Sequence, residues 1–401
     1  MSVPKPITVA DLPGLSQEKA DRMLRLLRDA RLPEQGVLPS AGWEYGITLP
    51  YLQSLKSFWE EDWSYASLLA KLEQYNHYTV EIEDVDVHFI HVRSSKEGAI
   101  PLLLSHGWPG SVLEFQKVIK PLSEPHEPGV PAFHLVIPSL PGYIFSGPMP
   151  KKGWNLLCTA RVFNTLMTEV LGYEEYVAQG GDWSFDVLRG LSVNHGQNCK
   201  LAHFNNFTAH PSTLEGLVKK AFSYLPFGLD SYAKSWIYSQ DELVRMKHSE
   251  KFYRDGWAYS FMMATKPATI GYALYDSPLG TLSWVGEKYH GWVDNNHPLP
   301  LEEVVDTVAL YYLTGTIHTS AMTYYENRHG TGEWLPMQKY GKTAISVFRW
   351  DMLYTPERWA KRIANVVFYK FHPEGGHFAA LEQPEALVED IRESVAMHWD
   401  A

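Results

Sequence analysis

Two different spacings of apolar residues divide the first part of the chain. Over residues 1–75 the apolar positions follow helical spacing in two stretches, the first beginning after Ser16, a residue type that caps helix starts. Between His77 and Val92 apolar and polar residues alternate, which predicts a hairpin of two strands with Asp84 in the turn. We therefore expect a helical N-terminal region that ends in this hairpin.

From residue 96 onward, short apolar runs that end in loops alternate with helical stretches. Runs of this kind before Phe207 are IPLLLS, FHLVIP, YVAQG and CKLAHF, and the pattern resumes after Gly330 with TAISVFRW and NVVFYKF. This alternation predicts an α/β fold with a mostly parallel central sheet and helices on both faces.

The aromatic-rich interval between the two groups of strands is too long for a loop inside a compact domain. We interpret residues 207–330 as a mainly helical lid inserted into a core formed by residues 96–206 and 331–401. Residues 1–95 are then an N-terminal extension of that core.

Composition narrows the classes of function. The net charge of −11 argues against a nucleic-acid partner and favours a neutral small molecule over an anion. The two cysteines, Cys158 and Cys199, form neither a disulfide framework nor a zinc motif. The first residues do not resemble a signal peptide, and no stretch has the about 18–20 apolar residues of a membrane-spanning helix. We expect a soluble, cytoplasmic protein without a membrane anchor.

The candidate chemistry lies at the ends of the predicted strands, where sites gather in open α/β sheets. Asp182 follows the strand YVAQG, with the small residues Gly180 and Ser184 two positions to either side. This is the spacing of a nucleophile elbow, with a carboxylate in place of the usual hydroxyl. The alternative from the residues alone is that Asp182 caps the following helix.

Three further strand ends carry residues that complete such a site. His377, after the last strand, is a candidate general base, and Asp351, after the preceding strand, is the candidate acid that orients it. The loop His106-Gly107-Trp108-Pro109-Gly110 has the composition of an oxyanion loop. The backbone N–H groups of Trp108 and Trp183 are then the candidate donors to an oxyanion. Nucleophile, acid and histidine occur in the order found in α/β-hydrolases.

With these motifs in place, the sequence resembles the epoxide hydrolases of the microsomal type, which include soluble fungal members. The resemblance covers nearly the whole chain, through WEYGITLPYL, HGWPGS, GGDW, TKPATIGYALYDSPLG, FRWDMLYTPERW and EGGHFAALEQPE. It implies the α/β-hydrolase fold with a lid. It also implies hydrolysis of an epoxide to a vicinal diol through an ester on Asp182, which water activated by His377 and Asp351 then cleaves. The implied partners are a small neutral epoxide and water, and neither a metal nor an organic cofactor is expected.

The same resemblance implies two lid tyrosines that hold and protonate the epoxide oxygen. The first matches Tyr259, seven residues before the lysine of TKP. The second matches Tyr324, with its neighbour Tyr325 as the alternative.

One departure from the family pattern keeps a catalytically silent binding protein open as an alternative. Phe185 stands where the family has a small residue after Gly-Asp-Trp, and it is expected to shift the elbow or alter the pocket. A haloalkane dehalogenase uses the same aspartyl ester, and Trp108 and Trp183 are suited to binding a halide. A catalytically silent binding protein is the third alternative. The N-terminal module is also a candidate support for a homodimer.

Overall fold

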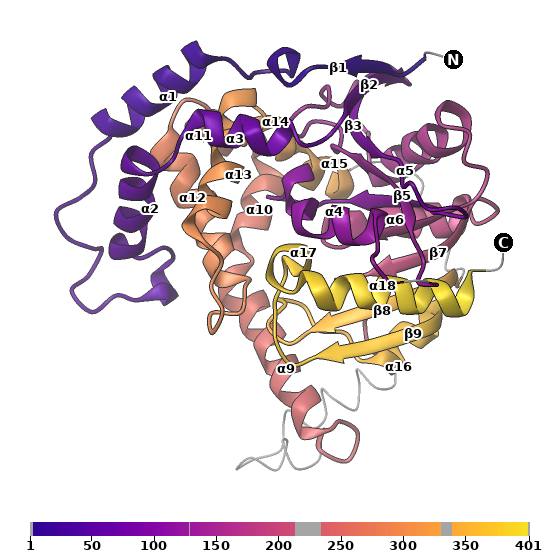
Figure 1. The fold of residues 1–401 in the computed structure, drawn as a ribbon. Helices are drawn as coiled ribbons and strands as arrows, with labels where there is room; N and C mark the ends of the chain where they lie inside the picture. Colours follow the sequence, from indigo (N-terminus) through magenta and orange to yellow (C-terminus); the bar gives the residue numbers. More distant parts are fainter. Residues whose placement is uncertain (1–2, 128, 213–233, 330–338, 400–401) are drawn as a thin grey trace.

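A single mixed sheet runs through the computed structural model of this chain, which describes residues 3–127, 129–212, 234–329 and 339–399. The strand order is β1-β2-β3-β5-β4-β6-β7-β8-β9 (Figure 1). The strands are β1 Lys5–Ile7, β2 His77–Ile82, β3 Val85–Val92, β4 Ile100–Ser105, β5 Phe133–Pro138, β6 Tyr176–Gly180, β7 Cys199–Phe204, β8 Tyr340–Phe348 and β9 Ala364–His372.

The sheet changes from antiparallel to parallel at β5. Strands β1, β2 and β3 pair antiparallel in sequence, and β3 pairs antiparallel with β5. All pairings from β5 across to β9 are parallel. The hairpin turn consists of Glu83 and Asp84, both with positive φ, as the two-residue turns that suit the twist of a hairpin require. The predicted hairpin is confirmed, and it extends the same sheet as the core strands.

Helices pack along the parallel strands. Helix α6 contacts β6, β7 and β8 and packs on α5, whereas α18 contacts β7, β8 and β9 and packs on α4. In Figure 1 α18 crosses in front of β8 and β9. The core helices are α4 Gln116–Ser123, α5 Leu156–Thr165, α6 Trp183–Asn194, α16 Glu357–Ile363, α17 Ala379–Glu382 and α18 Pro384–His398.

The N-terminal helices are α1 Gln17–Asp29, α2 Leu49–Glu61 and α3 Tyr65–Leu72. Ser16 caps α1 as predicted, since its side chain accepts a hydrogen bond from the backbone N–H of Lys19. The second predicted stretch is two helices, because Ser64 caps a new helix, α3, after α2 has ended.

Helices fill the described part of the chain between β7 and β8. They are α9 Gln240–Lys251, α10 Ala258–Thr265, α11 Pro267–Tyr275, α12 Pro278–Gly291, α13 Leu301–Thr314, α14 Ile317–Ser320 and α15 Met322–His329. Helices α1 and α2 lie against α12 and α13 (Figure 1). Residues 213–233 and 330 of the predicted lid lie outside the described residues, and the four segment boundaries stay predictions.

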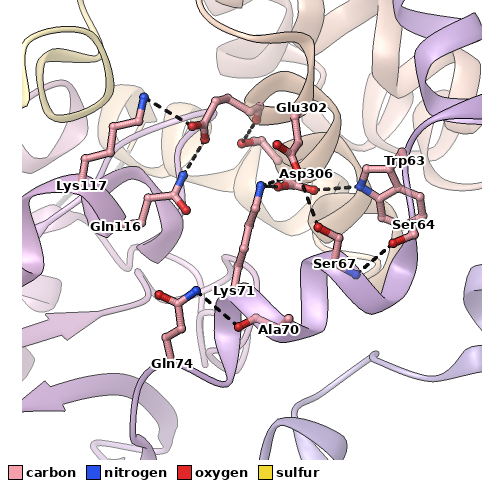
Figure 2. Close-up of polar contacts among 12 residues, drawn as sticks. Trp63, Ser64, Ser67, Ala70, Lys71, Gln74, Gln116, Lys117, Glu302 and Asp306 are labelled. Carbon is pink, nitrogen blue, oxygen red and sulfur yellow. Dashed lines mark hydrogen bonds and ion pairs between the residues drawn. The ribbon is translucent and has the colours of Figure 1, made fainter.

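A buried polar cluster ties the N-terminal helices to α13. Asp306 accepts hydrogen bonds from the Trp63 indole N–H at 2.8 Å and from the Lys71 ammonium at 2.6 Å. Figure 2 shows Lys71 between Asp306 and Glu302, which lies 2.9 Å from the same ammonium. Because the Asp306 carboxylate is buried, these partners replace the water that it loses on folding.

Within the described ranges, the chain has no helix of sufficient length and apolarity to cross a membrane.

Candidate active site

Asp182 occupies the sharp turn between β6 and α6. Its backbone has φ 50° and ψ −127°, a conformation that a non-glycine residue rarely adopts and that is typical of strained functional turns. Its carboxylate makes no capping hydrogen bond to α6, so the helix-cap alternative is wrong. The turn needs Gly180, because a Cβ there would lie 2.6 Å from the Ser105 carbonyl oxygen. The small side chain of Ser184 fits the turn, and its hydroxyl donates a hydrogen bond to the Ser105 hydroxyl at 2.6 Å.

The loop after β4 brings a backbone donor to this carboxylate. The N–H of Trp108 donates to Asp182 Oδ1 at 2.8 Å. Gly107 permits this approach, because a Cβ there would lie 2.4 Å from Oδ1. The N–H of Trp183 is at the first position of α6, where such groups have no partner inside the helix.

His106 and Pro109 shape the same loop. His106 Nδ1 lies 2.9 Å from the Gly107 carbonyl oxygen, and its Nε2 accepts from the N–H of Leu140 at 3.3 Å. Burial lowers the pKa of His106 to about 4, so its ring is neutral and fixed by these two bonds. Pro109 follows a cis peptide bond.

His377 bridges two carboxylates. Its Nδ1 lies 3.0 Å from Asp351 Oδ1, and its Nε2 lies 3.5 Å from Asp182 Oδ2. Burial alone lowers the pKa of His377, but the charges of Asp351 and Asp182 and the hydrogen bonds to both raise it to about 10. The free site therefore holds an imidazolium between two carboxylates at neutral pH.

A cavity of about 700 Å³ opens on the Asp182 carboxylate. Tyr259 and Tyr324 line it, both are buried, and their ring centroids lie 5.8 Å apart. Burial, reinforced by the Asp182 charge, raises the pKa of both phenols well above the ordinary value, so both are protonated donors. Tyr325 instead stacks on His329, and of the two neighbours it is Tyr324 that faces the cavity.

Phe185 packs without opening the elbow. Its ring is buried and contacts the rings of Phe204 and Phe207, with centroid distances of 5.7 and 5.2 Å. Its backbone N–H donates to the Asp182 carbonyl oxygen at 2.9 Å. The bulky side chain therefore forms part of the cavity wall beside the elbow.

Known proteins resemble this chain in both sequence and architecture. The sequence profile of the family described as "Epoxide hydrolase N terminus" matches residues 11–115. "Epoxide hydrolase 1" of Sus scrofa is 32% identical over 387 residues, which cover 90% of this chain and 83% of that protein. The chain belongs to the epoxide hydrolase family.

Solved structures agree with this assignment. Aspergillus niger epoxide hydrolase is 34% identical, covers 99% of this chain and 97% of its own, and superimposes with a TM-score of 0.84. Juvenile hormone epoxide hydrolase from the silkworm Bombyx mori is 26% identical, covers 99% and 95%, and has a TM-score of 0.87. The predicted α/β-hydrolase fold and the predicted family are thus confirmed, and this protein is an enzyme, an epoxide hydrolase, whose substrates are an epoxide and water.

Sequence reasoning missed polar residues that support the site of this epoxide hydrolase. Asn206 donates to Asp351 Oδ2 at 2.6 Å, so the carboxylate that faces His377 is held from both oxygens. The Asn205 side chain donates to the His377 carbonyl oxygen at 3.4 Å. Both asparagines directly follow β7, and the same strand-end rule that selected Asp351 could have selected them. Across the described parts of the chain, no three His, Cys, Asp or Glu side chains are grouped as metal ligands would be.

Proposed function

We propose that Asp182 opens the epoxide ring by attacking one of its carbons and forms a hydroxyalkyl ester. The observation that carries this proposal is the position of the carboxylate, which faces the cavity from a strained turn between Trp108 N–H and His377. Because Oδ1 already accepts from Trp108 N–H, Oδ2 is the oxygen left to attack. Oδ1 then becomes the ester carbonyl oxygen in place.

Ring opening also needs an acid, because an alkoxide is a poor leaving group. Tyr259 and Tyr324 would hydrogen-bond the epoxide oxygen from across the cavity and supply its proton. Burial keeps their phenols protonated, as this role requires.

His377 would then activate the water that cleaves the ester. Esterification removes the negative charge of Asp182, one of the two charges that hold the His377 proton. His377 is thereby able to lose that proton, which by way of solvent replaces the one that a tyrosine gave to the epoxide oxygen. The neutral imidazole then takes a proton from water, with Asp351 stabilising the imidazolium. The N–H groups of Trp108 and Trp183 would stabilise the oxyanion that develops on Oδ1.

The cavity favours a neutral, largely apolar epoxide. Aromatic side chains form much of its wall, among them Trp183, Phe185, Tyr253 and Trp257. Small-molecule sites are commonly apolar with a few placed polar groups, and here those groups are the carboxylate and the phenols. A homodimer and a cytoplasmic location stay predictions from the sequence.

The test follows the oxygen atoms through one turnover. With enzyme in excess over an aryl epoxide in water labelled with heavy oxygen, the diol should carry no label and Asp182 should gain it. Asp182→Ala should form neither ester nor diol. Label in the diol after the first turnover would mean that water attacks the epoxide directly.

A haloalkane tested in parallel addresses dehalogenation. The buried indole N–H groups of Trp108 and Trp183 have no hydrogen-bond partner among the described residues, as halide-binding donors would. We nevertheless expect no halide release, because the chain belongs to the epoxide hydrolase family. Halide release without diol formation would transfer the mechanism to the dehalogenase alternative.

A further inference from the structure

A small second cavity lies beside the nucleophile, separate from the large one. It has a volume of about 10 Å³, which is room for one water molecule. Asp182, His377, Glu114 and Trp108 line it, together with Asn205. It therefore adjoins both the carbon that water must attack and the base that must take a proton.

Glu114 contributes a carboxyl group to the lining of this small cavity. It lies in the short helical turn after the HGWPG loop, and its backbone N–H bonds the Ser111 carbonyl oxygen. Within the described residues its carboxyl group has no hydrogen-bond or ion-pair partner. Its Oε2 fills the space where Gly110 lacks a side chain, since a Cβ there would lie 2.3 Å away. Glu114 is only partly buried, so its carboxyl group can satisfy its hydrogen bonds with a water molecule in this cavity.

The electrostatic surroundings are consistent with a carboxyl group that meets the reacting centre. Burial raises the pKa of Glu114 to about 8, while the His377 charge opposes the shift and the Asp182 charge adds to it. Glu114 therefore interacts electrostatically with both residues of the proposed hydrolytic step. In either protonation state it retains an oxygen that accepts a hydrogen bond.

We propose that Glu114 holds the hydrolytic water in this cavity by accepting one of its hydrogens, while His377 accepts the other. With both hydrogens directed away, a lone pair of the water oxygen faces the carbonyl carbon of the Asp182 ester. The inference rests on the proposed ester mechanism and adds a residue to its second half. Glu114 is idle during ring opening, because the epoxide enters from the large cavity.

The step balances without another reactant. The water oxygen forms a bond to Cγ of Asp182 as one water O–H bond breaks and its proton passes to Nε2 of His377. The tetrahedral intermediate then expels the diol oxygen, which takes the proton from His377. The remaining hydroxyl proton passes to Nε2 of His377 as the Asp182 carboxylate re-forms with one oxygen from water, which restores the imidazolium of the free site.

The experiment separates ring opening from ester hydrolysis by rapid mixing with an aryl epoxide. Ester formation and decay are followed by tryptophan fluorescence and by the mass of the quenched protein. In Glu114→Met, which keeps the side-chain length but loses the strong acceptor, we expect hydrolysis to slow about 100-fold. Alkylation should change less than about threefold, and the ester should accumulate. Glu114→Gln retains an acceptor oxygen and should recover most of the hydrolysis rate.

A matched control and a second variant keep the outcome clear. Glu303→Gln removes a carboxylate that bonds Gln116 and Lys117 outside the cavity, and both rates should match those of the unaltered enzyme. Glu114→Leu repeats the test should Glu114→Met not fold. Equal slowing of both steps, or undiminished hydrolysis in Glu114→Met, overturns the proposal for Glu114. Absence of any ester in the unaltered enzyme and in His377→Gln would instead overturn the proposed ester mechanism.

Discussion

His377 Nε2 lies 3.5 Å from Asp182 Oδ2, so the base and the nucleophile form an ion pair before any substrate binds. This pairing changes the state of His377 during the proposed cycle. Together with Asp351, the Asp182 charge keeps the imidazole protonated, and the proposed ester removes that charge. Formation of the ester thus prepares the base that cleaves it.

Replacing His377 should therefore stop the cycle halfway. In His377→Gln we expect ring opening to continue, because Asp182 and both tyrosines are intact, while ester hydrolysis falls by at least about 10³-fold. The measurement is the mass of the protein after brief exposure to epoxide, which should rise by one substrate. A variant that turns over many substrate molecules would show that His377 is not the base.

The same ion pair should make stability depend on pH in a defined direction. The pKa of His377 is raised from 6.5 to about 10 in the folded protein, so its contribution to stability is complete below about pH 6.5 and is lost as pH rises through about 10. Lys288 titrates in the same window, and its contribution to stability rises with pH, because burial lowers its pKa to about 7. The comparison is therefore the unfolding midpoint in urea of the unaltered protein against His377→Gln across this range. The midpoint of the unaltered protein should fall more steeply with pH, and parallel curves would contradict the raised pKa.

The sequence predicted the strand ends well and the contacts between them less well. Asp182, Asp351 and His377 each follow an apolar strand, and the parallel register of those strands brings their side chains together. Local pattern cannot show which of Tyr324 and Tyr325 faces inward, since that depends on how α15 rotates against its neighbours. Nor could it place Glu114, which lies in a short helical turn several residues beyond the end of β4 and acquires its surroundings only through tertiary packing.

The tyrosines should act on ring opening alone. Tyr259→Phe and Tyr324→Phe each remove a donor that faces the cavity, and we expect each to slow alkylation about 10²-fold with little change in ester hydrolysis. Tyr325→Phe is the matched control, because its ring stacks on His329. The measurement is the rate of alkylation of each variant after rapid mixing with epoxide. A larger effect in Tyr325→Phe than in Tyr324→Phe would exchange their roles.

The oxyanion loop should not tolerate a side chain at Gly107. A Cβ in Gly107→Ala would lie 2.4 Å from both Cβ and Oδ1 of Asp182, so the carboxylate has to move away from Trp108 N–H. A displacement of this kind costs about 10²-fold in rate. Gly291→Ala provides the control, since its nearest neighbour would be the Glu287 side chain at 3.9 Å. Steady-state diol formation compares the two, and equal activity would show that the loop adjusts without loss.

The polar cluster beneath the N-terminal helices should matter for stability and leave chemistry untouched. Asp306→Ala leaves the Trp63 indole N–H without its acceptor and the half-buried Lys71 ammonium with Glu302 as its remaining partner, which should lower the free energy of unfolding by about 3 kcal/mol. The comparison is Asp276→Ala, which breaks the exposed pair with Arg22 and should cost less than about 1 kcal/mol. Urea unfolding of the two variants measures both quantities, while the rate of diol formation at low temperature should be unchanged in each. If the two losses were equal, burial of Asp306 would not be what gives the cluster its energy.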